Sequence, residues 1–179
     1  FDEKATTKTS DSLKSDVLTT LTNYNTNTLS QFDGVFRYSK VTGLIDGTDS
    51  SILSNITTLK IRKDFTPTLA SSTRYDVYFR NALFNPHSGH NAAAGGILES
   101  SGFKVSGDSS TVFFLDDDGQ GNVRRYSFSG ATRVYANENQ GTIDYATGAI
   151  TINSLSVLSV ENIRGSVSSK IELTVVPQS

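Results

Sequence analysis

Residues 24–63 constrain the fold of this chain more than any other stretch, because different local patterns follow one another there in a fixed order. An aromatic and aliphatic segment comes first, after which Ser39 can cap a short helix that stops at Gly47. Asp49 can cap a further turn, and over residues 55–63 the apolar period changes to two. The stretch therefore predicts a short helix, a capped turn and a half-buried strand. The inner face of that strand carries Thr57, Leu59 and Ile61.

A longer helix is predicted near the beginning of the chain. Ser10 or Asp11 can cap it, and it ends near Tyr24, where residues 25–28 compete for backbone hydrogen bonds. Its apolar stripe consists of Leu13, Val17, Leu18, Leu21 and Tyr24. A helix of about three turns is not stable alone in water. We therefore expect the helices to cover one side of a small sheet, with residues 32–38 contributing to the core.

The rest of the chain has β-type patterns at short intervals, separated by turn signals. Strands are predicted around Tyr75, around Phe103 and over residues 111–115, and the last one over residues 168–176. Residues 142–152 predict a hairpin whose Gly148 needs a positive φ. Turns are expected at residues 116–122 and 137–141.

These patterns predict an α+β fold that is mainly antiparallel β. Short N-terminal helices pack on a small sheet, and a β-sandwich-like module follows. The Pro67 turn and the Ser/Thr run after it indicate a soft boundary. We expect an α+β subdomain over residues 1–66 and a β-rich subdomain over residues 67–179.

Composition excludes several classes of function. The chain has 179 residues, of which 36% are hydrophobic, and no cysteine, so thiol catalysis, disulfides and thiolate metal sites are ruled out. The net charge of −2 is dispersed and gives no basic surface for nucleic acid. No apolar run approaches the roughly 20 residues of a membrane helix. Because the sequence opens at Phe1 and contains no Met, we expect it to be part of a longer protein.

His87 and His90 are the two histidines of the sequence, and on a helix their spacing could place both on one metal ion. Pro86 and the Ser88-Gly89 pair argue against a helix here, and no nearby carboxylate or cysteine completes a site. Two loop histidines are the favoured interpretation, and a metal site is the alternative. No metal ligand is assigned.

Residues 116–122, DDDGQGN, partly match a calcium-binding loop at Asp116 and Asp118. Gln120 stands where an Asp or Asn is usual, Ser127 stands where the bidentate Glu should be, and the flanks have strand patterns. A solvated hairpin turn is the prediction, and calcium binding is the alternative.

No catalytic apparatus is evident. The sequence contains neither a phosphate-binding loop nor a nucleophile elbow, and no histidine has the context of a catalytic triad. Acidic residues in turns could supply a carboxylate pair for glycoside hydrolysis, but no apolar pocket can be inferred beside them. We predict no catalytic residue and no cofactor, and a protein that is not an enzyme.

Basic and aromatic side chains predict a surface for protein contacts instead. Arg124 and Arg125 adjoin Tyr126, with Arg133 and Tyr135 close in sequence, and this mixture is typical of interface anchors. Residues 81–96 form a long irregular stretch of the kind that makes functional contacts. The candidate interface residues are Arg124, Arg125, Tyr126, Phe84, His87 and His90.

Residues 29–63, LSQFDGVFRYSKVTGLIDGTDSSILSNITTLKIRK, resemble the baseplate wedge protein of T-even-like contractile-tailed phages, gene product six, and its baseplate J-like relatives. The shared order is Phe32-Asp33, the V-F-R-x-S segment, the L-I-D helix end and the D-x-S-I-L turn. A hairpin similar to G-T-I-D-Y-x-T-G-x-I, residues 141–150, also occurs there.

The resemblance implies a C-terminal portion of a structural protein of the virion tail baseplate. Such proteins pair with themselves, so a homodimer is expected, and bind other wedge proteins. Neither nucleic acid nor a membrane is implied as a partner. The alternative function is a receptor-binding or carbohydrate-binding β module of a phage tail or cell-surface protein, with Tyr126 and Tyr135 on an exposed face.

Overall fold

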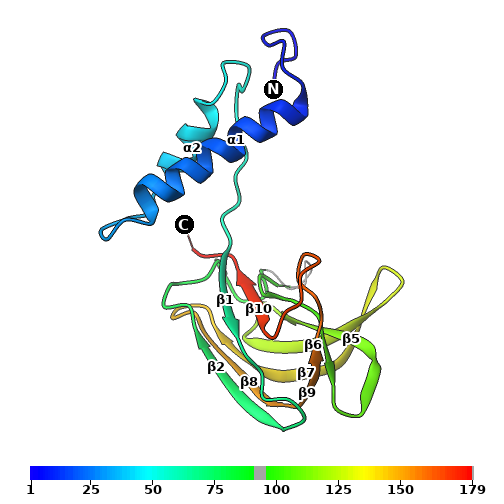
Figure 1. The fold of residues 1–179 in the computed structure, drawn as a ribbon. Helices are drawn as coiled ribbons and strands as arrows, with labels where there is room; N and C mark the ends of the chain where they lie inside the picture. The colour runs from blue at the N-terminus through cyan, green and yellow to red at the C-terminus, as the bar shows by residue number, and fades with distance from the viewer. Residues whose placement is uncertain (91–95, 179) are drawn as a thin grey trace. The chain divides into compact units, whose positions relative to one another are not determined.

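The computed structural model describes residues 1–90 and 96–178 and divides the chain into two compact units, Phe1–Leu59 and Lys60–Ser179 (Figure 1). The first unit holds the helices and the second holds the strands. The predicted α+β class with mainly antiparallel strands is confirmed. The predicted contact loop over residues 81–96 lies partly outside the described residues, at 91–95.

The helical unit begins with α1, Ser10–Tyr24, as the apolar stripe predicts. Its cap is Thr9 rather than Ser10 or Asp11, because the Thr9 hydroxyl accepts a hydrogen bond from the Ser12 amide at 3.2 Å. After Tyr24 the chain continues for one turn of π-helix, η1, Asn25–Leu29. The second helix, α2, is Tyr38–Asp46, and Gly47 follows at its C-cap.

Polar contacts link the elements of the helical unit to one another. The Asn55 side-chain amide donates to the Asp46 carboxylate at 2.6 Å, and the Tyr38 hydroxyl donates to the Thr57 carbonyl at 2.6 Å. Hydrogen bonds from the Ser51 amide and hydroxyl lower the pKa of Asp49 to about 2, and Lys8 lies 3.0 Å from the same carboxylate. The capped turn predicted at Asp49 is therefore present.

One expectation for this region is wrong. Residues 32–38 are exposed throughout and contribute nothing to a core within the unit. No strand lies within residues 1–59, and packing of the helices on a small sheet stays a prediction. The apolar residues of 32–38 would form the same local pattern in a buried segment as in an exposed one. The sequence therefore does not distinguish the two cases.

The predicted strand over residues 55–63 is displaced along the chain. β1 is Ile61–Phe65, and it pairs in antiparallel register with β10, Ile171–Val175. Strand hydrogen bonding begins only where β10 offers a partner, which excludes Thr57 and Leu59. Since β1 lies in the second unit, the compact units divide at Leu59, earlier than residue 66. Whether each unit folds as an independent domain stays a prediction.

The strands form two antiparallel sheets. The smaller has the order β1-β10-β3, where β3 is Glu99–Ser100, and the larger has the order β2-β8-β7-β6-β5-β4-β9. The strands of the larger sheet are β2 Thr73–Tyr78, β4 Phe103–Val105, β5 Asp108–Asp117, β6 Asn122–Ser129, β7 Thr132–Asp144, β8 Ala149–Leu155 and β9 Val157–Val160.

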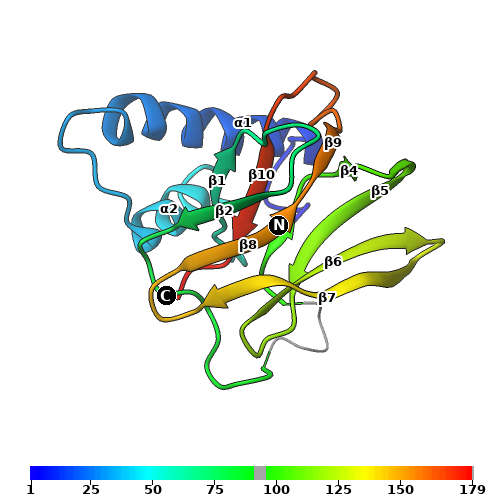
Figure 2. The ribbon, with the colours of Figure 1, turned by 90° about the horizontal axis from the view of Figure 1, so that it is seen from below.

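The larger sheet curls until its ends meet (Figure 2). β8 pairs with β2 and β7 at one end, whereas β9 follows after a single residue and pairs with β4 at the other end. The chain bends there at Ser154, whose φ is 47°. An isolated bridge from Leu69 to Val157 adds to this closure. The β-sandwich-like module is thus a curled sheet closed by one continuous segment and covered by the smaller sheet.

One apolar core lies between the two sheets. The smaller sheet contributes Ile171, Leu173 and Val175, all fully buried. Fully buried side chains of the larger sheet are Phe103, Leu115, Val123, Ile150, Ile152, Leu155 and Val157. Burial of each such side chain is worth roughly 1.5–3 kcal/mol, so this unit has the apolar contacts that the helical unit lacks.

The turn predictions have mixed outcomes. The hairpin between β7 and β8 is confirmed, and Gly148 has a φ of 70°. The turn predicted over residues 137–141 is wrong, because β7 runs through it. Gly141 lies directly against the Thr151 backbone, so its missing side chain permits close strand packing instead of a turn. Asp116 and Asp117 belong to β5, and the β5–β6 turn begins at Asp118.

Candidate partner-binding face

Three neighbouring strands place aromatic and charged side chains on one face of the larger sheet, opposite the core. In β5 the alternation puts Phe113 and Leu115 into the core, so Phe114 and Asp116 point the other way. The pairing of β5 with β6 and of β6 with β7 then aligns side chains from all three strands. This aromatic–arginine face consists of Phe114, Asp116, Arg124, Tyr126, Phe128, Arg133 and Tyr135.

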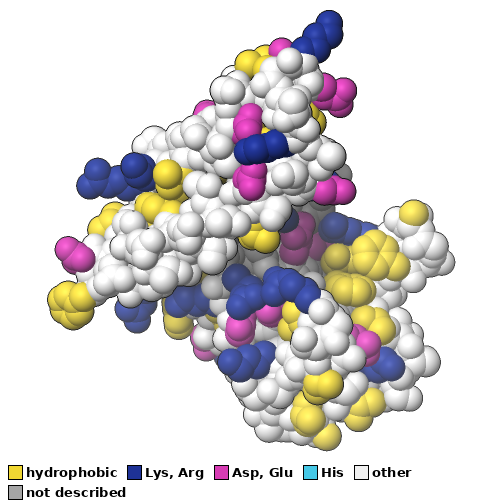
Figure 3. Space-filling model, turned by 45° about the horizontal axis from the view of Figure 1, so that its top comes forward, with side chains coloured by type: hydrophobic (Ala, Val, Ile, Leu, Met, Phe, Trp, Pro, Cys, Tyr) yellow, Lys and Arg dark blue, Asp and Glu magenta, His cyan; other side chains and the backbone are white. Residues whose placement is uncertain are grey.

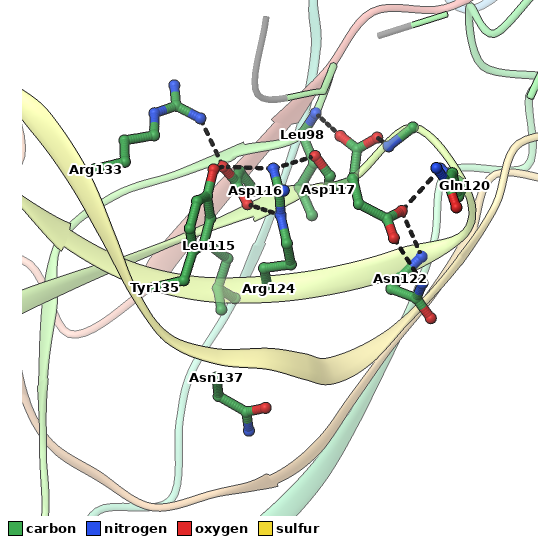
Figure 4. Close-up of polar contacts among 12 residues, drawn as sticks. Leu98, Leu115, Asp116, Asp117, Gln120, Asn122, Arg124, Arg133, Tyr135 and Asn137 are labelled. Carbon is green, nitrogen blue, oxygen red and sulfur yellow. Dashed lines mark hydrogen bonds and ion pairs between the residues drawn. The ribbon is translucent and has the colours of Figure 1, made fainter. Parts of the chain in front are cut away.

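A buried carboxylate organises one end of the face (Figure 4). Asp116 is only 1% exposed and accepts hydrogen bonds from Arg124 Nε at 3.0 Å and Arg133 Nη1 at 2.6 Å. The Tyr135 hydroxyl donates to the same carboxylate at 3.0 Å. One carboxylate therefore holds two guanidinium groups and a phenol in fixed positions, which a buried acid requires.

Aromatic rings form the other end of the face. Phe114, Tyr126 and Phe128 contact one another with centroid distances of 5.4–5.7 Å. The Arg133 guanidinium lies 4.6 Å from the Tyr126 ring centre, and that of Arg124 lies 4.2 Å from the Tyr135 ring centre. The two ends of the face are thus joined by stacked arginines, which limits the motion of every side chain involved.

The electrostatics follow from this arrangement. Burial, together with the Asp116 carboxylate, raises the pKa of the Tyr135 hydroxyl. Burial also raises the pKa of Tyr126. Burial lowers the pKa of Arg133, but the hydrogen bond to Asp116, the charge of that carboxylate and the neighbouring Tyr126 and Tyr135 together outweigh burial, so the pKa is raised. These shifts keep the phenols of Tyr126 and Tyr135 neutral and the Arg133 guanidinium charged at neutral pH.

Of the predicted neighbours, Arg124 and Tyr126 meet on this face but Arg125 does not. Arg125 points to the opposite side of β6, with its guanidinium 5.1 Å from the Phe113 ring centre. Burial lowers the pKa of Arg125, and its Nε makes no hydrogen bond to the part of the chain that the structure describes. Adjacent residues of a strand always point to opposite faces, which the grouping of Arg124 with Arg125 overlooked.

Sequence reasoning missed Phe114, Asp116 and Phe128 as members of the face. The sequence pattern places Asp116 in a turn, and it does not connect the two phenylalanines with Tyr126. A pairing of the FFLDD and RRYSF segments in antiparallel register could have found them, because it sets Phe114 opposite Tyr126 and Asp116 opposite Arg124.

Asp117 points the other way and anchors the loop that precedes β3. Its Oδ1 accepts hydrogen bonds from the buried amides of Ile97 and Leu98 at 2.6 and 2.8 Å, and its Oδ2 accepts from the Tyr145 hydroxyl. Burial and this carboxylate together raise the pKa of Tyr145 strongly. Asp118 accepts from the amides of Gln120 and Asn122, so the chain itself occupies these carboxylates.

The other predicted contact residues lie in the loop after β2. Phe84, His87 and His90 are exposed and come together: the Phe84 and His90 rings are 5.5 Å apart, and those of His87 and His90 are 4.8 Å apart. Among residues 1–90 and 96–178, no group of three or more His, Cys, Asp or Glu side chains could hold a metal ion. Within the described chain, no helix is long and apolar enough to span a membrane.

A comparison with known protein families finds a match in the N-terminal part of the chain. Residues 1–64 match the family model described as baseplate structural protein gp6, C-terminal domain III. The matched part, residues 1–64, is gp6-like. No curated protein matches the sequence. This match to a baseplate structural protein places the chain in the tail baseplate of the virion, as a structural component.

The gp6 match covers the helical unit and ends within β1. This gp6-like unit leaves many large apolar side chains exposed, and hydrophobic groups lie among charged ones on the surface drawn in Figure 3. The exposed large apolar residues of this unit are Phe1, Leu18, Phe32, Val35, Phe36, Tyr38, Leu53 and Ile56. Part of this surface is an open apolar groove of about 430 Å³, lined mainly by Leu13, Val17, Leu18, Leu21 and Ile52.

Proposed function

We propose that this gp6-like chain is a structural subunit of the baseplate wedge that pairs with itself and binds other wedge proteins. The observation that carries the proposal is the incomplete core of the gp6-like unit. Among its apolar side chains only Leu13, at 4% exposure, and Val41 are buried. A unit of about 60 residues is marginally stable even when it buries most of its apolar surface. Packing against another protein supplies the burial that is missing.

The groove along α1 is the proposed self-association surface. Leu18 is 66% exposed at its edge, and Leu21 and Val17 follow on the same side of the helix. Lys14 is the charged residue in the groove lining, so a symmetric copy meets an almost wholly apolar surface. A two-fold symmetric contact uses the same patch on both subunits. The single exposed apolar face of α1 can serve as that patch.

The aromatic–arginine face is the proposed contact for a different wedge protein. Phe128 is 51% exposed at its rim, whereas Tyr126, at 5%, supports it from below. Two arginines against one aspartate leave a surplus positive charge, which favours an acidic group on the partner. Arg124 and Tyr126 thus act as the rigid base of a contact, and Phe84, His87 and His90 form a second exposed group. Arg125 belongs neither to the aromatic–arginine face nor to this second group.

The carbohydrate-binding alternative has less support. A sugar ring stacks on an accessible aromatic face, but Arg124 covers the Tyr135 ring and Arg133 covers the Tyr126 ring. Enzymatic activity also lacks support, because Asp116 and Asp117 are already bound by arginines and backbone amides. Reproducible hits on a glycan array would favour the alternative.

Light scattering behind a sizing column, over a range of protein concentrations, tests the self-association. We expect a dimer for the unmodified chain and a shift toward monomer for Leu18→Asp, because a charge in the groove must be desolvated on pairing. Val167→Asp is the matched control, since Val167 is also an exposed apolar residue but belongs to the other unit. It should leave the dimer intact.

A strict monomer at every concentration would reject the self-association. Equal loss of dimer in the Leu18→Asp and Val167→Asp variants would instead reject the groove as its location.

A further inference from the structure

The loop after β2 folds back on itself so that its two histidines meet. The His90 amide donates to the His87 carbonyl at 3.0 Å, and Gly89 between them has a φ of 76°, as a tight turn requires. The turn is attached to the β5–β6 turn, because the Gly89 amide donates to the Gly119 carbonyl at 2.8 Å. The Asn85 side chain donates to the same carbonyl at 3.3 Å. The first and last residues of the turn therefore project their rings to the same side.

The two rings present nitrogens to each other. His90 Nδ1 lies 3.1 Å from His87 Nε2, and the ring planes are almost perpendicular at 87°. The other nitrogen of His87, Nδ1, lies 3.2 Å from the Ser88 carbonyl oxygen, to which only an N–H can donate. Placing the proton on Nδ1 leaves a lone pair on Nε2, and this lone pair faces His90 Nδ1. Edge contact with Phe84 restrains the His90 ring.

The spacing of the two nitrogens suits two ligands on one metal ion. Imidazole nitrogens bind Zn²⁺ at about 2.0–2.1 Å, so nitrogens 3.1 Å apart subtend an angle of roughly 100° at the ion. That angle lies between the octahedral and tetrahedral values. A hydrogen bond from the second nitrogen of a ligand ring to a backbone carbonyl is the usual way in which ligating histidines are oriented.

We propose that His87 Nε2 and His90 Nδ1 form a binding site for a divalent transition-metal ion such as Zn²⁺. The described part of the chain supplies no third His, Cys, Asp or Glu ligand at this point, so water completes the coordination. Imidazole suits zinc, copper and nickel, whereas calcium and magnesium take oxygen ligands. The bound ion fixes the His87–His90 turn and adds positive charge to an exposed loop.

The sequence makes the test specific, because it contains two histidines. The untagged full chain is titrated with ZnCl₂ by calorimetry, and the nitrogen chemical shifts of both imidazole rings are followed by NMR. We expect saturable binding of one ion, with Nε2 of His87 and Nδ1 of His90 as the shifted nitrogens. CaCl₂ should produce neither heat nor shift.

Two single substitutions complete the test. His87→Gln and His90→Gln should each weaken Zn²⁺ binding at least tenfold, while unchanged circular dichroism shows that the fold is kept. Phe84→Leu keeps both ligands and should stay within about threefold of the unmodified chain. Unchanged affinity in either glutamine variant, or a shift of only one ring, overturns the site.

Discussion

At the residue scale, Asp117 connects parts of the chain that are distant in sequence. Its carboxylate is fully buried. It accepts hydrogen bonds from the backbone amides of Ile97 and Leu98, both core residues, and from the Tyr145 hydroxyl. A buried anion is tolerated only when such donors surround it. Gly96 also lies against this side chain, where a Cβ could not fit. Asp117 is therefore a structural residue of the β-rich unit.

We predict that Asp117→Ala lowers the free energy of unfolding by about 3 kcal/mol, because it leaves two buried amides without an acceptor. Asp117→Asn should cost less, since an amide oxygen still accepts both. Urea denaturation followed by near-ultraviolet circular dichroism measures the difference. Glu138→Ala, at an exposed position of β7, is the control and should change stability by less than about 0.5 kcal/mol. Equal effects of all three substitutions would contradict this role.

At the element scale, the β7–β8 hairpin shows how a local signal becomes a tertiary requirement. Gly148 has a φ of 70°, and the space for its missing side chain is filled by the Asn81 backbone and the Phe79 side chain. The amide of Phe79 donates to the Gly148 carbonyl at 2.8 Å. The turn therefore contacts the end of β2 and helps fix the edge of the curled sheet.

Gly148→Ala should destabilise the protein by more than Gly130→Ala. Both glycines have a positive φ, 70° and 63°, which costs alanine about 1–2 kcal/mol. Among the described residues, a Cβ at Gly130 meets nothing within 4 Å beyond its own chain neighbours. At Gly148 it also meets backbone, so overpacking adds about 1–3 kcal/mol there. Thermal melting of the two variants measures the difference. Equal melting temperatures would contradict the prediction, because they would show that the backbone around Gly148 shifts to accommodate a Cβ without cost.

At the scale of the whole molecule, the two units differ in what stabilises them. The β-rich unit encloses a continuous core drawn from both sheets, whereas the helical unit buries little beyond Leu13 and Val41. Most helical stability in proteins comes from packing of an apolar face, and α1 leaves much of that face open. The helical unit should therefore be the less stable part when the chain is alone.

We predict that heating gives two transitions, with the helical signal at 222 nm lost before the β-rich unit unfolds. The first transition should move to higher temperature as protein concentration rises, because self-association stabilises the folded unit by mass action. Calorimetry at several concentrations measures both effects. A single transition that is independent of concentration would contradict both the difference in stability between the two units and the self-association.

Elements with local signals were predictable from the order of amino acids alone. The stripe from Leu13 to Tyr24 predicted α1, Gly47 predicted the end of α2, and Gly148 predicted the hairpin turn, each because a residue's own backbone preference decides the structure. The order of motifs over residues 29–63 led to the gp6 family, which the family match over residues 1–64 supports.

Which surfaces are covered, in contrast, follows from the folded arrangement of the strands and loops. Residues 32–38 have the apolar composition of a core segment yet are exposed, and Arg124 and Arg125 are adjacent yet lie on opposite faces. His87 and His90 meet because Gly89 reverses the chain against Gly119, and Asp116 is buried because β6 and β7 bring arginines to it. Such outcomes depend on strand register and on contacts between distant residues, and no local preference encodes either.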